Sequence, residues 1–134
     1  MAKGLETHRE RQKKLSLLGK DLTRRSRAKC ELCTTSGVAL SIYEVPVAPK
    51  DPDLAHVIHV CDACSSQLDK PKSIQSSHWR VLSETVWSEV PAAQVLSVRI
   101  LKHLAKTEGW AQEILESAYL DEDLTTWIEE ATIA

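Results

Sequence analysis

The sequence predicts an α+β protein: a four-cysteine zinc ribbon or treble-clef-like β-hairpin module followed by a small helical bundle. The four cysteines form two Cys-x-x-Cys pairs, at 30–33 and 61–64. Two β-forming stretches joined by a proline-rich loop lie between the pairs. Apolar residues then recur at helical spacing. We therefore expect a basic N-terminal helical extension (1–22), the metal module (23–70) and a helical region packed on it (71–134).

The two cysteine pairs indicate a metal centre. A two-residue gap lets both sulfurs of a pair turn toward one point, and two such pairs supply the four thiolates of a tetrahedral zinc site. We predict that Zn²⁺ binds Cys30, Cys33, Cys61 and Cys64. Three alternatives use the same residues. They are two disulfides, a thioredoxin-like redox pair, which needs one motif inside a βαβ unit, and an iron–sulfur centre.

Composition limits the class of protein. The chain has 134 residues, 43% of them hydrophobic, with four Trp and no Phe. No apolar run approaches the roughly 18 residues that cross a bilayer, and the charged N-terminus lacks the apolar segment of a signal peptide. We therefore expect a cytoplasmic protein without a membrane partner, in which the thiols stay reduced.

Charge is distributed unevenly along the chain. The net charge is −2, but residues 1–29 carry ten Lys/Arg against three Asp/Glu, and residues 107–134 carry eight Asp/Glu and no Lys/Arg. Such asymmetry is typical of a basic arm that binds a polyanion. It is equally compatible with pairing between the two ends, or with two solvated helix faces.

The basic segment predicts two helices before the first cysteine pair. The first spans about 5–18 and ends at Gly19 as a C-cap, and the second spans about 21–27. A cluster of cations, which suits phosphate contacts, lies beside the first cysteine pair: Arg24, Arg25, Arg27 and Lys29. No aromatic residue is interleaved, so the segment does not indicate a base-stacking platform. Nucleic acid or a protein is the expected partner.

The stretch between the cysteine pairs predicts a hairpin with strands over 38–45 and 54–60. Gly37 supplies a positive φ in the turn after the first pair. A hairpin this small is not stable alone, so we expect each metal-bound pair to hold one end of it. A short helix beginning at the second pair would favour the treble-clef variant.

Histidines give a weaker signal than the cysteines. His56 and His59 fall on the returning strand, where their odd separation places them on opposite faces. The layout resembles the His-Asn-His nuclease module, but Glu44 occupies the place of that family's general base. Nuclease activity is therefore not expected, and a degenerate nuclease scaffold is the lesser alternative. His78 and His103 fit structural roles.

The remaining sequence predicts about four helices. Ser76-Ser77 is a candidate N-cap, Pro91 a candidate first-turn residue and Asp121 a candidate cap of the last helix, and Gly109 separates two helices. The four tryptophans are expected in the core.

Several motifs resemble the PhnA-like family, named for an alkylphosphonate-uptake operon. The resemblance covers about residues 23–130 and is to the N-terminal zinc-ribbon region, without the C-terminal β-domain of longer members. It is strongest in the helical half. The matching stretches are Arg24–Cys33, Ile42–Pro46, Val60–Cys64, His78–Arg80, Val86–Val95, Trp110–Gln112 and Tyr119–Glu122. The resemblance implies a bacterial cytoplasmic protein with zinc on the four cysteines, and no settled activity.

These observations favour a zinc-binding, non-enzymatic adaptor or regulatory protein with a structural metal. Four cysteines fill the first coordination shell and leave no position for the water that catalytic zinc requires. No catalytic residues are assigned. The alternative is a nucleic-acid-binding module that uses the cations before the first cysteine pair. A hydrolytic enzyme using His56, His59 or His78 is a third hypothesis.

Overall fold

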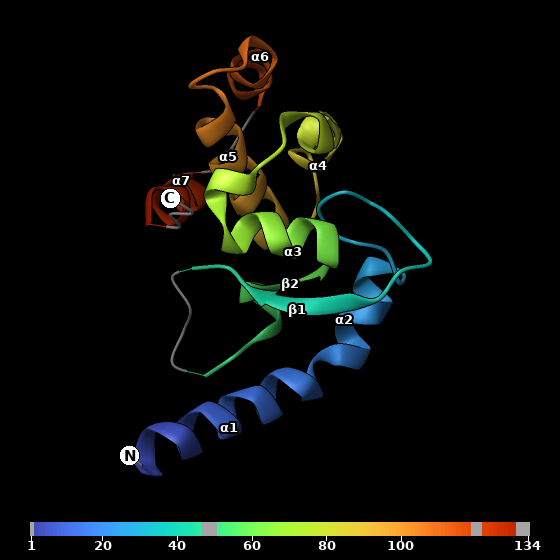
Figure 1. Cartoon of the computed structure of the whole chain (residues 1–134), viewed down its shortest axis with the longest axis vertical. Coiled ribbons are helices and arrows are strands. Elements are labelled where there is room, and N and C mark those ends of the chain that lie inside the picture. Colours follow the sequence, from blue (N-terminus) through green and yellow to red (C-terminus); the bar gives the residue numbers. More distant parts are fainter. Residues whose placement is uncertain (1, 47–50, 119–121, 131–134) are drawn as a thin grey trace.

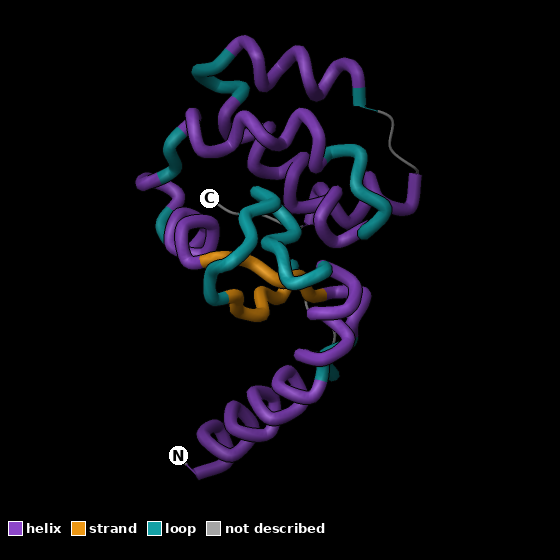
Figure 2. Tube along the Cα trace, turned by 90° about the vertical axis from the view of Figure 1, so that its right-hand side faces the viewer, coloured by secondary structure: helices purple, strands orange, loops and turns teal. Residues whose placement is uncertain are grey.

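The structure is a computed structural model that describes residues 2–46, 51–118 and 122–130, and it places a two-stranded sheet between two groups of helices (Figures 1 and 2). Helices α1 (Ala2–Leu17) and α2 (Gly19–Ser26) lie on one side. Strands β1 (Leu40–Glu44) and β2 (Val57–Cys61) pair antiparallel. The mixture of helices with a small antiparallel sheet agrees with the predicted α+β class at this level.

The N-terminal helices break where the sequence predicted, but for another reason. Leu18 is the N-cap of α2 and Gly19 is its first residue, so the prediction that Gly19 caps the first helix is wrong. Helix α2 ends because Arg27 and Ala28 both adopt the left-handed conformation, with φ of 57° and 59°. The Ala28 N–H donates to the Thr23 carbonyl oxygen at 3.1 Å. The chain thereby turns sharply into the first cysteine pair.

The hairpin is shorter than predicted at its loop end. Residues Leu54–His56 form a 3₁₀ helix, η1, in place of the first residues of the returning strand. The Asp53 carboxylate causes this by accepting the His56 N–H at 3.0 Å, which caps the turn. His56 is therefore not a strand residue, contrary to prediction. Gly37 has a φ of 74°, which confirms its predicted role.

Helices follow the second cysteine pair to the end of the described chain. They are α3 (Asp62–Asp69), η2 (Pro71–Ser73), η3 (Ser76–Val81), α4 (Leu82–Thr85), α5 (Pro91–Leu104), α6 (Gly109–Ser117) and α7 (Glu122–Glu130).

Two of the predicted helix starts can be checked. Pro91 opens α5 as predicted, because its fixed φ suits a first turn. The prediction for Ser76-Ser77 is wrong: Gln75 is the N-cap, and the helix that follows is 3₁₀. The predicted cap Asp121 lies outside the described residues.

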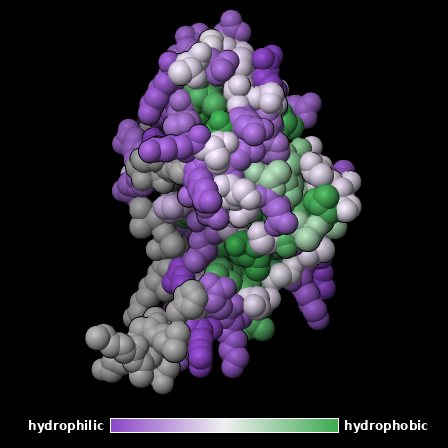
Figure 3. Space-filling model, viewed as in Figure 1, coloured by the Kyte–Doolittle hydropathy of each residue, from purple (hydrophilic) through white to green (hydrophobic). Residues whose placement is uncertain are grey.

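A large core joins the sheet to the helices that follow it. Its buried residues come from β2, from α3 and from most of α5, and they include three of the four cysteines. Trp79 is fully buried within this core, whereas Trp110 and Trp127 are partly buried and pack against it. Trp87 is 52% exposed, so its predicted core position is wrong. Figure 3 shows hydrophilic side chains over much of one face, with apolar ones gathered across the middle.

A smaller cluster covers the opposite face of the sheet. Leu15 of α1 and Leu22 of α2 pack on Val57 of β2, with Leu18, Ile42 and Leu54 beside them. Successive strand residues point to opposite faces, so Val57 faces α1 and α2 while Ile58 joins the large core. Both faces of the hairpin are therefore covered.

Among the described residues, the search for a membrane-spanning helix, one both long and apolar enough for the bilayer, finds none.

Candidate metal centre

The four cysteines meet at one point beside the open end of the hairpin. Their Sγ atoms all lie within 4.8 Å of one another. The Cys30 and Cys64 sulfurs are 3.7 Å apart, and the Cys33 and Cys61 sulfurs are 3.5 Å apart. Both short distances join one pair to the other, so the two cysteine pairs form a single cluster.

The first pair lies on a tight turn that directs backbone N–H groups at sulfur. Thr34 donates to the Cys30 carbonyl at 3.0 Å, and the Cys30 N–H donates back to Thr35 at 2.9 Å. Thr34 adopts a φ of 67° to close this turn. The Cys33 N–H points at the Cys30 sulfur at 3.4 Å. Hydrogen bonds of this kind stabilise a thiolate.

The second pair joins a strand to a helix. Cys61 is the last residue of β2 and the N-cap of α3, and Cys64 lies in the first turn of that helix. The positive end of the helix dipole therefore lies beside two sulfurs, where it favours negative charge. A helix starting at the second pair is the feature predicted for the treble-clef variant.

The cluster has the dimensions of a zinc site. A tetrahedron with Zn–S bonds of about 2.3 Å has sulfurs roughly 3.8 Å apart, close to the 3.5 Å and 3.7 Å found between pairs. Three of the cysteines are buried and Cys33 is half-buried, so the ion would be shielded from solvent. The four cysteines suit a metal ion such as zinc.

The thiols do not ionise alike at this spacing. The hydrogen bond between the Cys30 and Cys64 sulfurs lowers the pKa of Cys30 to about 4. The same hydrogen bond raises the pKa of Cys64, and burial raises the pKa of Cys61. One thiolate therefore forms readily, while further negative charge beside it is unfavourable without a cation.

His78 also reaches the cluster, which sequence reasoning did not predict. Its Nε2 lies 3.3 Å from the Cys64 sulfur, and its ring meets Trp79 edge-on with centroids 4.8 Å apart. The indole N–H of Trp79 donates to Gln67 of α3 at 2.8 Å, which fixes η3 against that helix. Because His78 does not belong to the group of mutually close ligand atoms, it is placed to hydrogen-bond to a ligand. No local pattern signals this role, since 14 residues separate His78 from Cys64.

The other two candidate histidines lie apart from the sulfur cluster. His56 Nδ1 contacts the Asp53 carboxylate at 2.7 Å, and the ring lies 4.9 Å from that of Trp127. His59 is 8% exposed, and burial lowers its pKa. Its Nδ1 is 3.5 Å from the Ser26 hydroxyl. The His56 ring thus contacts Asp53 and Trp127, and the His59 ring contacts Ser26.

The cations before the first cysteine pair divide into two kinds. Arg25 points inward: it donates to both carboxylate oxygens of Glu31, at 2.9 Å and 2.8 Å, and to the carbonyl oxygens of Leu54 and Val57. In contrast, Arg24, Arg27 and Lys29 are exposed. The guanidinium of Arg25 is therefore committed to the protein itself and is not presented to a phosphate.

Glu31 links the turn of the first cysteine pair to the sheet. Its side chain is 5% exposed and accepts the backbone N–H of His59 at 2.8 Å, while its own N–H donates to the His59 carbonyl. The edge of β2 that does not pair with β1 is thus covered by the residue inside the first Cys-x-x-Cys. Arg25 neutralises that residue, so α2, the first cysteine pair and β2 form one unit.

Glu44 pairs with a helix residue. Arg11 of α1 forms an ion pair with the Glu44 carboxylate, in which the Arg11 Nε lies 3.0 Å from Oε2. Glu44 therefore attaches α1 to the hairpin.

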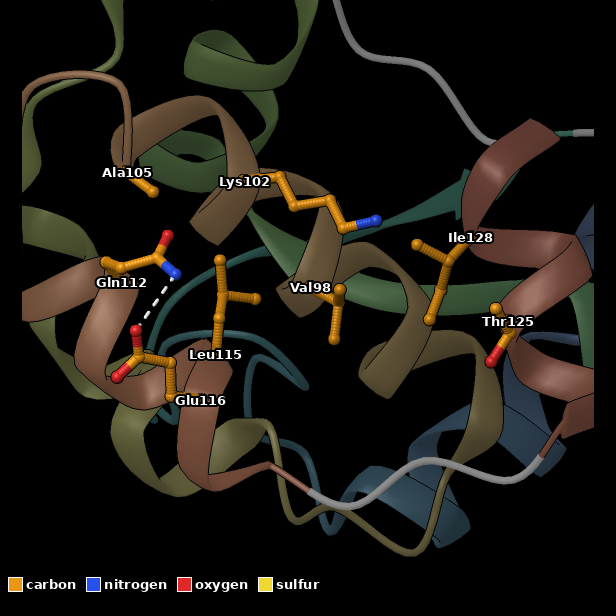
Figure 4. A pocket seen from close by; sticks show the side chains of 8 residues that line it. All are labelled: Val98, Lys102, Ala105, Gln112, Leu115, Glu116, Thr125 and Ile128. Atoms are coloured by element: carbon orange, nitrogen blue, oxygen red, sulfur yellow. Dashed lines mark hydrogen bonds between the residues drawn. The ribbon is translucent and has the colours of Figure 1, made fainter.

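A cavity of about 380 Å³ lies between α5, α6 and α7 (Figure 4). Val98, Leu115 and Ile128 line its apolar part, and Gln112 donates to Glu116 at 3.3 Å near its rim. None of the described residues that line it is a cysteine or a histidine. The cavity is therefore separate from the sulfur cluster.

Neither the protein-family models, nor the curated proteins, nor the solved structures include a match to this chain.

Proposed function

We propose that this chain binds one zinc ion with Cys30, Cys33, Cys61 and Cys64, and that the metal is structural. The observation that supports this most strongly is the convergence of four sulfurs within 4.8 Å of one another. Four thiolates complete a tetrahedral shell, which characterises structural rather than catalytic zinc. Three of these cysteines also belong to the large buried core, so the metal would stabilise that core directly.

The proposal extends to the role of the protein. We infer a non-enzymatic adaptor or regulatory protein, because a saturated metal shell leaves the zinc no position for substrate or water. A zinc ribbon or treble clef is the fold variant that the order of turn, hairpin, turn and helix supports. The resemblance to the N-terminal region of PhnA-like proteins remains a prediction and agrees with this role.

Metal analysis of the purified, reduced chain tests the proposal. We expect one zinc per chain, no acid-labile sulfide and, after exchange with Co²⁺, the sulfur-to-metal charge-transfer absorption of a four-thiolate site. Added imidazole should leave that spectrum unchanged if the shell is saturated. Cys33→Ser should alter the spectrum, whereas the matched control Ser65→Ala should not. A folded chain without metal, or with an iron–sulfur cluster, would overturn the proposal.

A further inference from the structure

The two N-terminal helices share one inward face. Arg11, Leu15, Leu18, Leu22 and Arg25 follow each other at intervals of four, three, four and three residues, which keeps them on one side of a helix. The leucines pack in the small cluster on Val57, and the two arginines pair with Glu44 and Glu31 of the metal module. Although the chain bends at Leu18, both helices therefore turn the same side toward the hairpin.

The opposite side of these helices carries a row of cations, which we call the outer basic face. It consists of Arg9, Lys13, Lys20, Arg24 and Arg27, all of them exposed. At about 100° per residue the four helical positions Arg9, Lys13, Lys20 and Arg24 lie roughly half a turn away from the inward leucines. Arg27 follows them as the C-cap of α2. Figure 3 shows mainly hydrophilic side chains among the described residues at the end of the molecule where α1 lies.

Carboxylates of the described residues neutralise little of the charge on the outer basic face. Within the described part of the chain, Arg24 forms its only ion pair with Asp21, at 4.0 Å between exposed side chains, and such pairs are weak. No carboxylate of the described residues pairs with the other four cations. The inward Arg11 and Arg25 instead occupy the hairpin carboxylates Glu44 and Glu31.

The spacing of these cations suits an extended polyanion. A helix rises about 1.5 Å per residue, so the 18 steps from Arg9 to Arg27 span about 27 Å. Duplex DNA rises about 3.4 Å per base pair, so this length corresponds to roughly eight base pairs. No aromatic residue lies within 1–29, which favours contact with phosphates over contact with bases.

The apolar side of the helices argues against a membrane as the partner. A helix that lies on a membrane buries an apolar face in the lipid. Here Leu15 and Leu22 are 7% and 0% exposed, because they pack against the sheet. We propose that the outer basic face binds the phosphate backbone of duplex nucleic acid, with the metal module as its scaffold. This inference goes beyond the structural zinc and needs only that the chain is folded.

Salt-dependent binding tests the inference. We would titrate the zinc-loaded full chain against a fluorescent 20-base-pair DNA at increasing salt and read the anisotropy. Five phosphate contacts predict a slope of log K against log salt of about −4.5, since each contributes about −0.9. The triple variant K20S/R24S/R27S should reduce this to about −1.8. The same titration with a duplex RNA of the same sequence shows which of the two nucleic acids the face binds more tightly.

A matched triple variant controls for net charge. K72S/K102S/K106S removes three exposed cations, one each from η2, from α5 and from the turn after α5, and should keep the slope of the unmodified chain. Equal slopes for both triples, or no binding at low salt, would overturn the inference. So would tighter binding to anionic vesicles than to DNA. Zinc content is measured on every sample, so the absence of DNA binding by a zinc-loaded, folded chain contradicts this inference alone.

Discussion

The two faces of the hairpin are covered by different means. On one face, Ile58 and Val60 join a large apolar core that also contains Cys30, Cys61 and Cys64. On the other face, three buried residues form the apolar contact, and charged groups supply the rest: Arg25 with Glu31, and Arg11 with Glu44. The five-residue strand β2 thus separates a face stabilised by core packing around the four-cysteine cluster from a face stabilised by ion pairs.

The difference shows how a small sheet can serve two purposes. The metal side is packed and closed, which suits a structural role. On the other side the two inward arginines attach α1 and α2 to the sheet, and this leaves the opposite side of those helices exposed.

Chelation of the metal should have the largest effect. Structural zinc contributes roughly 10–16 kcal/mol in zinc-finger peptides, which is as large as the whole stability of about 5–15 kcal/mol of a typical domain. We expect added chelator to remove hydrogen-exchange protection from β2 and α5, because three of the cysteines lie in their shared core. Persistent protection of α5 in the metal-free chain would contradict this.

Two leucine truncations compare the faces directly. Leu96 of α5 and Leu22 of α2 are both 0% exposed, but they belong to different clusters. Each Leu→Ala change should cost about 2–5 kcal/mol of unfolding free energy by leaving a cavity. We expect the loss of unfolding free energy in L96A to lie at the upper end of this range, because the large core around Leu96 cannot collapse into the cavity. Hydrogen exchange should spread through the core in L96A and stay within α1 and α2 in L22A. Identical exchange patterns would remove the distinction.

Arg25→Ala should destabilise the ion-pair face by about 3 kcal/mol. The change leaves the Glu31 carboxylate, 5% exposed, without its cation, and removing one partner of a buried pair is strongly unfavourable. Urea unfolding measures the loss. Arg24→Ala is the matched control, because its exposed side chain should change stability by no more than about 0.5 kcal/mol. Equal losses for the two neighbours would show that Arg25 has no special position.

His78→Ala should weaken zinc binding about tenfold, as typically follows when a partner of a metal ligand is removed. With the thiolate as acceptor, the Nε2–H of His78 donates to the Cys64 sulfur across 3.3 Å. Competition with a zinc chelator measures the affinity. His78→Gln, whose amide can donate to sulfur, should recover part of it, and His103→Ala in α5 should change nothing. Full affinity in H78A would contradict the hydrogen bond.

The smallest effect concerns Tyr43 and high pH. Burial, followed by the charge of Asp69, raises the pKa of the Tyr43 phenol above its ordinary value of 10.0. The neutral phenol therefore stabilises the fold fully below pH 10, and this contribution is lost as pH rises through the raised pKa. Unfolding titrations across this range should show a decline that Tyr43→Phe removes. An unchanged decline in Y43F would assign it to other groups.

Local spacing predicted that the four cysteines cluster, but it did not predict the position of His78 beside them. Each cysteine pair closes a turn of four residues, so its geometry depends on neighbours in the sequence. His78 reaches Cys64 only because Trp79 and Gln67 hold η3 against α3. Likewise, the side chain of Trp87 is largely apolar, yet it is 52% exposed. Sequence spacing could not show this, because the burial of such a side chain depends on where the next helix packs.

The sequence by itself determined the mixed helix and hairpin class and the four candidate ligands, because both follow from short-range spacing and periodicity. Only the tertiary structure decided between the neighbours Arg24 and Arg25. The two are chemically identical, and the phase of α2 against the sheet directs one to Glu31 and the other to solvent. The inward pattern of two arginines and three leucines was present in the sequence, but its meaning depended on two carboxylates, Glu31 and Glu44, that lie elsewhere in the chain.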